Sequence, residues 1–187
     1  CSEPLSNQKF SNPRCSFDGK YWYLSVGIEV KKPAENLTNE VIGIDLGIKD
    51  TAILSNGKKY KNINKKVNVK KTKKRLKRLQ KRVSRKYENN KEGNRYLKTA
   101  NIVKLEKQIR LLHRRLTNIR LNYNHKITTE IVKTKPSQIV IEDLNIKGMM
   151  KNRHLSKAIA EQSLYQFTQL LTYKCELYGI KLVKADR

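Results

Sequence analysis

The apolar residues of the first third of the chain follow strand patterns. Residues 20–30 alternate with a period of two, and their apolar positions are Leu24, Val26, Ile28 and Val30. Residues 41–47 form an almost unbroken apolar run, which is typical of a central strand covered on both faces. Two more strands are predicted at 51–55 and 58–63, joined by the hairpin turn Asn56-Gly57. This part of the chain therefore predicts a sheet.

Two long helical segments follow. Residues 65–86 carry a thin apolar stripe of Leu76, Leu79 and Val83, and residues 88–94 are predicted as a turn. The next apolar residues alternate between spacings of three and four, as in a coiled-coil seam: Ile102, Leu105, Ile109, Leu112, Leu116, Ile119 and Tyr123. The simplest arrangement is an antiparallel helical hairpin over residues 65–134, with an apolar seam and a basic outer face.

The last quarter of the chain returns to strands. Residues 138–142 form an apolar strand that ends in acids, and residues 180–185 form a final strand. Between them, residues 155–178 are predicted as one amphipathic helix ending at Gly179. Its expected buried residues are Leu155, Ile159, Phe167, Leu170, Leu171 and Tyr178.

The order of these elements predicts an α/β fold with a mixed sheet and an inserted helical hairpin. We expect that fold to occupy residues 40–187. Residues 1–39 are expected to contribute a preceding β segment and a linker, and residues 1–19, rich in Ser, Asn and Pro, are predicted to be irregular. Tyr21, Trp22 and Tyr23 are expected in a core, with stacking on bases as the alternative.

Charge narrows the class of partner. The chain has 42 Lys and Arg against 16 Asp and Glu, a net charge of +26, which favours a polyanion such as nucleic acid. Residues 65–86 hold 13 basic residues and no acid, more than solubility requires, so we expect phosphate contact there. The candidates that avoid the apolar stripe are Lys70, Lys74, Lys77, Arg78, Lys81 and Arg85.

Other features exclude several function classes. Cys1, Cys15 and Cys175 are too widely spaced for a disulfide framework or a zinc site, and the three histidines stand apart from them. There is no run of about 18 apolar residues and no signal peptide. We therefore expect a cytoplasmic protein with neither a membrane nor a small molecule as partner. Because the chain begins with Cys1 rather than Met, we expect a fragment or a processed product.

Two carboxylates stand in apolar strands. Asp45 lies between Gly43 and Gly47, and Glu142 ends the strand 138–142. A buried ionised carboxylate costs several kcal/mol unless a cation or strong hydrogen bonds compensate it. Each acid has a simpler alternative, which is to cap the turn that follows its strand. Taken together, Asp45 and Glu142 favour a site for Mg²⁺ or Mn²⁺, because divalent cations relieve the repulsion between two adjacent carboxylates.

The segments VIGIDLGIKDTAILSNG and IVIEDLNIKGMMKN, followed by YGIKLVKADR, resemble TnpB-like proteins of bacterial insertion sequences. These proteins are RNA-guided nucleases related to the type V CRISPR effectors and long described as probable transposases. The resemblance extends from about Lys20 onward. It implies a ribonuclease-H-like, RuvC-type domain in which Asp45 and Glu142 are the catalytic metal ligands of a two-metal phosphodiester hydrolysis. It also implies DNA and guide RNA as partners, held by the helical insertion and the preceding barrel.

The same resemblance implies missing parts. The family pattern continues with a Cys-pair zinc ribbon and a third catalytic aspartate, which would lie beyond Arg187; Asp186 does not occupy that position. We therefore expect no zinc in this chain, and nucleic-acid binding with little or no cleavage by the chain alone. Two alternatives stay open: a nuclease-dead RNA-guided DNA-binding regulator, and a basic RNA-binding protein on the same fold.

Overall fold

The computed structural model describes residues 9–29 and 36–185, which cluster into two compact units. One unit contains residues 9–29 and 73–115, and the other contains residues 36–72 and 116–185. The long helices α1 (Val67–Asn89) and α2 (Ala100–Lys133) each contribute residues to both units.

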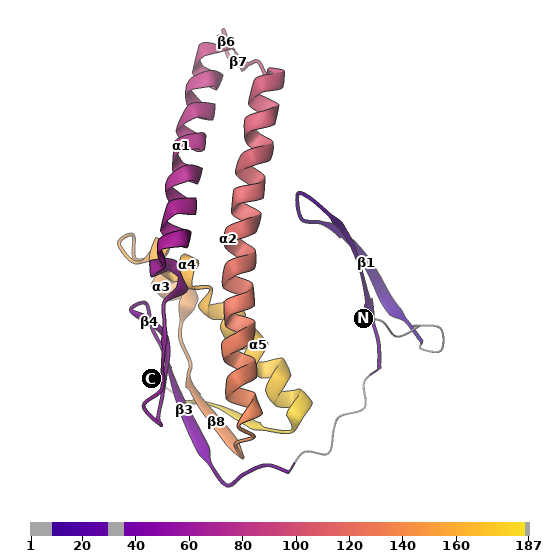
Figure 1. Ribbon diagram of the computed structural model, residues 1–187, viewed down its shortest axis with the longest axis vertical. Coiled ribbons are helices and arrows are strands. Elements are labelled where there is room, and N and C mark those ends of the chain that lie inside the picture. The colour runs from indigo at the N-terminus through magenta and orange to yellow at the C-terminus, as the bar shows by residue number, and fades with distance from the viewer. Residues whose placement is uncertain (1–8, 30–35, 186–187) are drawn as a thin grey trace. The chain divides into compact units, whose positions relative to one another are not determined.

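A five-stranded mixed sheet forms the centre of the second unit (Figure 1). Its spatial order is β5-β4-β3-β8-β9, in which β3 pairs in parallel with β8, and β8 with β9, while β4 and β5 are antiparallel to their neighbours. The strands are β3 (Val41–Leu46), β4 (Asp50–Leu54), β5 (Lys59–Lys61), β8 (Gln138–Glu142) and β9 (Lys181–Ala185). All five predicted strands are therefore present, and a mixed α/β fold is confirmed.

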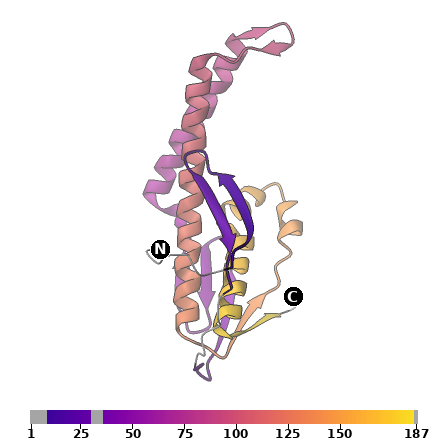
Figure 2. The same ribbon diagram turned by 90° about the vertical axis from the view of Figure 1, so that its right-hand side faces the viewer.

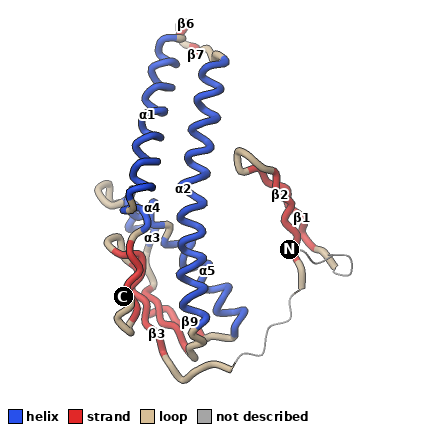
Figure 3. The backbone as a smooth tube through the Cα atoms, viewed as in Figure 1, coloured by secondary structure: helices blue, strands red, loops and turns tan. Residues whose placement is uncertain are grey.

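Strand β3 buries only one of its faces. Ile42, Ile44 and Leu46 are buried, whereas the alternating residues Val41 and Asp45 are exposed. The prediction that this strand is covered on both faces is therefore wrong. The physical reason is that the C-terminal part of α2 and helix α5 (Leu164–Tyr178) pack against the same face of the sheet (Figure 3).

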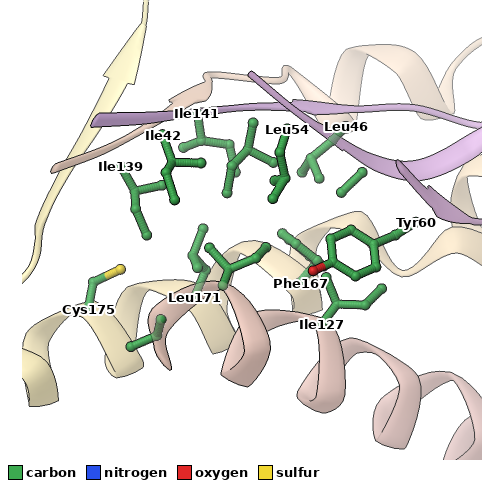
Figure 4. Close-up of a cluster of buried hydrophobic side chains, with 14 of the residues drawn as sticks. Ile42, Leu46, Leu54, Tyr60, Ile127, Ile139, Ile141, Phe167, Leu171 and Cys175 are labelled. Carbon is green, nitrogen blue, oxygen red and sulfur yellow. The ribbon is translucent and has the colours of Figure 1, made fainter. Parts of the chain in front are cut away.

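The main core lies between that sheet face and the two helices (Figure 4). Ile139 and Ile141 of β8 face Phe167 and Leu171 of α5, and Ile127 of α2 extends the predicted seam beyond Tyr123. Burying a side chain of this size stabilises the fold by about 1.5–3 kcal/mol relative to its exposed state. The β8 strand carrying Glu142 is thus fixed by the best-buried residues of the unit.

The predicted helix 155–178 is two helices, so that prediction is wrong in part. Helix α4 (Ser156–Gln162) and α5 are separated by Ser163, which adopts a left-handed conformation with φ 56° and ψ 43°. Leu155 precedes α4 and is exposed, although it was expected to be buried. Ile159, Phe167 and Leu171 are buried as predicted. A short helix, α3 (Ile146–Met150), follows β8, and α5 ends at Gly179 with φ 70°.

In the first unit, α1 and α2 run antiparallel and are joined by the small strands β6 (Lys91–Glu92) and β7 (Arg95–Tyr96) (Figure 2). A 3-10 helix, Ile63–Lys65, precedes α1. Val83 of α1 packs with Ile102 and Leu105 of α2 in a small separate core. The predicted helical hairpin and its seam are confirmed in this unit.

A second hairpin, β1 (Ser11–Phe17) and β2 (Trp22–Gly27), also belongs to the first unit. Strand β1 lies in a region predicted to be irregular, so that prediction is wrong. Its period-two signal is weak, because Pro13 and the left-handed Asn12 (φ 48°) interrupt it and the pairing with β2 is irregular there. Strand β2 ends before Val30, which lies outside the described residues.

The aromatic residues at the start of β2 are open to solvent. Every residue of β1 and β2 is exposed, and so is Tyr21, which precedes β2. The prediction that Tyr21, Trp22 and Tyr23 lie in a core is therefore wrong.

Candidate metal centre and basic helix

The pairing of β3 with β8 brings the two candidate metal ligands to neighbouring positions. Ile44 lies directly opposite Ile141 in this parallel pair, and Asp45 and Glu142 are the next residues of their strands. Because side chains alternate between the faces of a sheet, both acids project from the face opposite the buried Ile44 and Ile141. The two strands therefore lie side by side and run parallel.

Asp45 and Glu142 border a shallow, open hollow of about 400 Å³. Gly43 and Val140 line the same hollow, together with Ser55 at the end of β4. The Gly43 N–H donates a hydrogen bond to Ser55 Oγ at 3.0 Å, and the Ser55 N–H donates to the Gly43 carbonyl at 2.9 Å. The sequence gives no signal for Ser55, because only its pairing with Gly43 brings it to the hollow that the two acids border.

Neither acid of the candidate site is fully buried, contrary to what the apolar strands around them predict. Asp45 is exposed and Glu142 is half-buried. The free-energy cost of burying a carboxylate is therefore not the reason why a cation would bind here. Two like charges on adjacent strand positions repel each other, and this repulsion is relieved when both bind one divalent cation. Proximity, rather than burial, is therefore the physical basis of the candidate site.

The donor set suits a hard cation. Carboxylate and hydroxyl oxygens border the hollow without any Cys or His, and this combination is typical of Mg²⁺ or Mn²⁺ rather than zinc. Within residues 9–29 and 36–185, no group of three or more His, Cys, Asp or Glu side chains is placed to hold a metal ion. Asp143 has another role: its carboxylate pairs with Lys184 at 3.5 Å, and its N–H donates to the Ala185 carbonyl.

A set of polar side chains fixes the loop that follows Asp45. Gln162 donates through Nε2 to the carbonyls of Gly47 at 2.9 Å and Ile48 at 3.2 Å. Asn62 donates to the same Ile48 carbonyl at 2.9 Å, and Lys65 Nζ donates to the Lys49 carbonyl at 2.8 Å. Each donor lies 14 or more residues from the carbonyl that it contacts, so no short-range pattern in the sequence reveals these contacts. They restrain the end of β3 on which Asp45 lies.

The six basic residues predicted on α1 are all exposed. Two hollows of about 500 Å³ and 390 Å³ follow one face of the helix, and they share Arg78 and Lys81. The spacing of three and four residues places this basic stripe on a single helix face; it consists of Lys74, Lys77, Arg78, Lys81, Arg82, Arg85 and Lys86. Arg82 and Lys86 were not among the predicted contacts, and the buried Leu76 and Val83 lie on another face.

The described part of the chain contains no helix long and apolar enough to cross a membrane.

The fold and the site together define a class of protein: an α/β domain with paired acids on adjacent parallel strands and a basic helical hairpin inserted between them. Residues 24–153 match the model of the OrfB_IS605 family, described as "Probable transposase". The chain therefore belongs to this family of TnpB-like transposon proteins.

Two curated relatives show how much of such a protein the chain spans. The "Putative RNA-guided DNA endonuclease" of Streptomyces pristinaespiralis is 31% identical over 167 residues, which cover 89% of this chain and 38% of that protein. The "Putative RNA-guided DNA endonuclease InsQ" of Escherichia coli strain K12 is 31% identical over 170 residues, covering 82% and 39%. The chain thus spans about two fifths of the length of these relatives.

Solved structures agree in fold. A CRISPR-Cas12f ternary complex superposes with a TM-score of 0.52 at 17% identity, covering 89% of this chain and 32% of that chain. A Cas12f1–sgRNA–target DNA complex gives a TM-score of 0.55 at 19% identity, covering 88% and 32%. At this identity the likeness concerns the α/β architecture alone.

Proposed function

We propose that this chain provides the metal-binding core of a RuvC-type, ribonuclease-H-like nuclease that cleaves DNA under the direction of a guide RNA. The observation that carries the proposal is the parallel pairing of β3 with β8, which puts Asp45 and Glu142 on adjacent strands beside an open hollow. The printed names of the curated relatives support RNA-guided DNA cleavage as the activity of the whole protein.

Asp45 and Glu142 would hold Mg²⁺ or Mn²⁺ through their carboxylate oxygens. Bound there, the metal would supply charge stabilisation to a phosphodiester undergoing in-line displacement, and a second such ion would share that role, as in other two-metal sites. The protein's own part is to keep both carboxylates in place before the metal arrives. The buried β8 strand and the hydrogen-bonded loop after β3 provide that rigidity.

The basic stripe of α1 would hold the nucleic acid. Six of its seven cations are exposed, Lys86 is half-buried, and all lie along one helix face, so they can contact successive phosphates of a backbone without reading bases. Binding of the backbone alone fits RNA-guided recognition, in which base pairing recognises the sequence and the protein binds the phosphate backbone. Zinc has no place in this proposal for the described residues, because no Cys or His lies near the acids.

The test is Mg²⁺-dependent cleavage by the complete protein purified with its own co-expressed RNA. We expect Asp45→Asn and Glu142→Gln to abolish cleavage of a matching DNA while leaving its binding intact. Asp143→Asn is the matched control, since this neighbouring acid pairs with Lys184, and it should still cleave. Unimpaired cleavage by Asp45→Asn would refute the assigned site. Binding without cleavage by the wild-type protein would instead favour a nuclease-dead regulator.

A further inference from the structure

The two acids of the candidate metal site lie just beyond the part of their strands that pairs directly. The paired positions of β3 and β8 end at Ile44, one residue before Asp45. Past that point Asp45 pairs with Ile53 of β4, and Glu142 pairs with Ala185 of β9. The separation of the two carboxylates therefore depends on what holds the β3–β4 turn, because the pairing of β3 with β8 stops short of them.

Two buried amide side chains hold that turn by its backbone. Gln162 Nε2 donates to the carbonyls of Gly47 and Ile48, and Asn62 Nδ2 donates to the Ile48 carbonyl. Gln162 is 3% exposed and Asn62 is 9% exposed, whereas Lys65, the third donor to this turn, is exposed. Asn62 and Gln162, called the amide clamp here, are therefore the part of the contact that is shielded from water.

A second set of hydrogen bonds orients the amide clamp. The Asn64 N–H donates to Asn62 Oδ1 at 2.8 Å, which directs the amino group of Asn62 toward the turn. Asn64 Nδ2 donates to the Glu161 carbonyl at 2.8 Å, and Arg120 Nε donates to Asn64 Oδ1 at 2.9 Å. The amide clamp is thus joined to α4 through a backbone carbonyl and to α2 through Arg120.

The side-chain oxygen of Gln162 indicates that stability alone does not explain this residue. Among the residues that the structure describes, Gln162 Oε1 is the one buried side-chain oxygen or nitrogen without a hydrogen-bond partner. A buried acceptor that receives no hydrogen bond lowers the stability of the folded state. The net stabilisation from Gln162 is therefore smaller than its two hydrogen bonds suggest, which favours a role in placing the turn.

We propose that Asn62 and Gln162 are positioning residues for the metal site, which hold the β3–β4 turn so that Asp45 stays close enough to Glu142 for both to bind one divalent cation. The proposal rests on the metal site proposed above. Both amides act through the backbone two and three residues after Asp45. Ligands that are held in place before the cation arrives bind it more tightly than ligands that the cation must order.

Two conservative variants release the turn. Asn62→Ser keeps an oxygen that can cap the 3-10 helix and loses the donor to Ile48, whereas Gln162→Met keeps the length of the side chain and loses both donors. Calorimetry of this chain should show Mn²⁺ binding about tenfold weaker in each variant. In the complete protein with its co-expressed RNA, cleavage should require about tenfold more Mg²⁺ and should recover at high Mg²⁺. Asp45→Asn should not recover, because it lacks the ligand itself.

Cys175→Ala is the matched control for lost stability. Cys175 is buried in the same core, at the opposite end from Leu46 (Figure 4), so its truncation should lower the unfolding midpoint and leave Mn²⁺ affinity unchanged. An equal loss of Mn²⁺ affinity in Cys175→Ala would overturn the proposal, because general destabilisation would then explain the effect.

Wild-type Mn²⁺ affinity in both clamp variants, together with weakened binding in Asp45→Asn, would overturn the positioning role and leave the metal site in place. If the wild-type chain bound no Mn²⁺, or if Asp45→Asn bound it as tightly as the wild type, the proposed function itself would fail, and the positioning role with it.

Discussion

Replacing four cations of α1 by glutamine isolates the contribution of the basic stripe. Lys77, Arg78, Lys81 and Arg85 are exposed and border the two hollows on one face of the helix. Glutamine is a good helix former and keeps a long polar side chain, so the variant should retain the helix and its packing through Val83. What changes is the charge that would face phosphate.

The magnitude follows from counterion release. Each phosphate neutralised on a duplex contributes about 0.9 to the slope of log affinity against log salt, so four contacts contribute about 3.6. Between 50 and 200 mM salt, wild-type affinity should therefore fall roughly 150-fold more than that of the quadruple variant. Near 1 M salt the two proteins should bind almost equally weakly.

Fluorescence anisotropy with a labelled RNA–DNA heteroduplex of about 20 base pairs measures the two slopes. The control exchanges four exposed lysines of the sheet unit for glutamine: Lys59, Lys61, Lys133 and Lys181. Both variants lose the same net charge. Equal slopes for the α1 variant and the control would show that binding follows net charge, and would refute a specific role for the stripe.

Three further predictions concern stability. Phe167→Ala empties a core position with 0% exposure and should lower the free energy of unfolding by about 3–5 kcal/mol in urea titrations, whereas Tyr165→Ala, on the exposed side of α5, should change it little. Burial lowers the pKa of Lys174, whose ammonium donates to two threonine hydroxyls and a backbone carbonyl. At pH values between that lowered pKa and the ordinary pKa of lysine, the unfolded chain binds more protons than the folded one. The free energy of unfolding therefore rises with pH in this window. Lys174→Met should flatten this rise at pH values below the ordinary lysine pKa of 10.5, and an unchanged pH slope would contradict the assignment. Gln162→Leu removes the donor to the Gly47 carbonyl and should cost about 1–3 kcal/mol, so an unaltered denaturation midpoint would show that this hydrogen bond is dispensable.

The elements that the sequence predicts well are those with strong local patterns. The seam from Ile102 to Tyr123 repeats with a clear period, and strands 41–47 and 138–142 are short apolar runs, so the type and bounds of these elements follow from short-range information. The adjacency of Asp45 and Glu142 follows from the family resemblance, which implies that both are ligands of one metal site. Predicting this adjacency required no knowledge of contacts between distant residues.

The features that were missed depend on contacts between distant residues. The run Val41 to Leu46 looks the same whether one face or both faces of its strand are covered, and only the packing of α2 and α5 decides between them. The break at Ser163 lacks a Gly or Pro signal in the sequence; it arises where Gln162 turns toward Gly47 while Leu164 enters the core. Ser55 reaches the site only through its pairing with Gly43.

The central claim is that Asp45 and Glu142 jointly bind a divalent cation, and Mn²⁺ titration of this chain by isothermal calorimetry tests it most directly. Asp45→Asn and Glu142→Gln should each weaken Mn²⁺ binding at least about tenfold, since the loss of even an indirect metal contact commonly has that effect. Asp143→Asn removes the carboxylate that pairs with Lys184 and lies next to Glu142 in the sequence. This variant should bind Mn²⁺ as tightly as the wild type does. Wild-type Mn²⁺ affinity in Asp45→Asn would contradict the account.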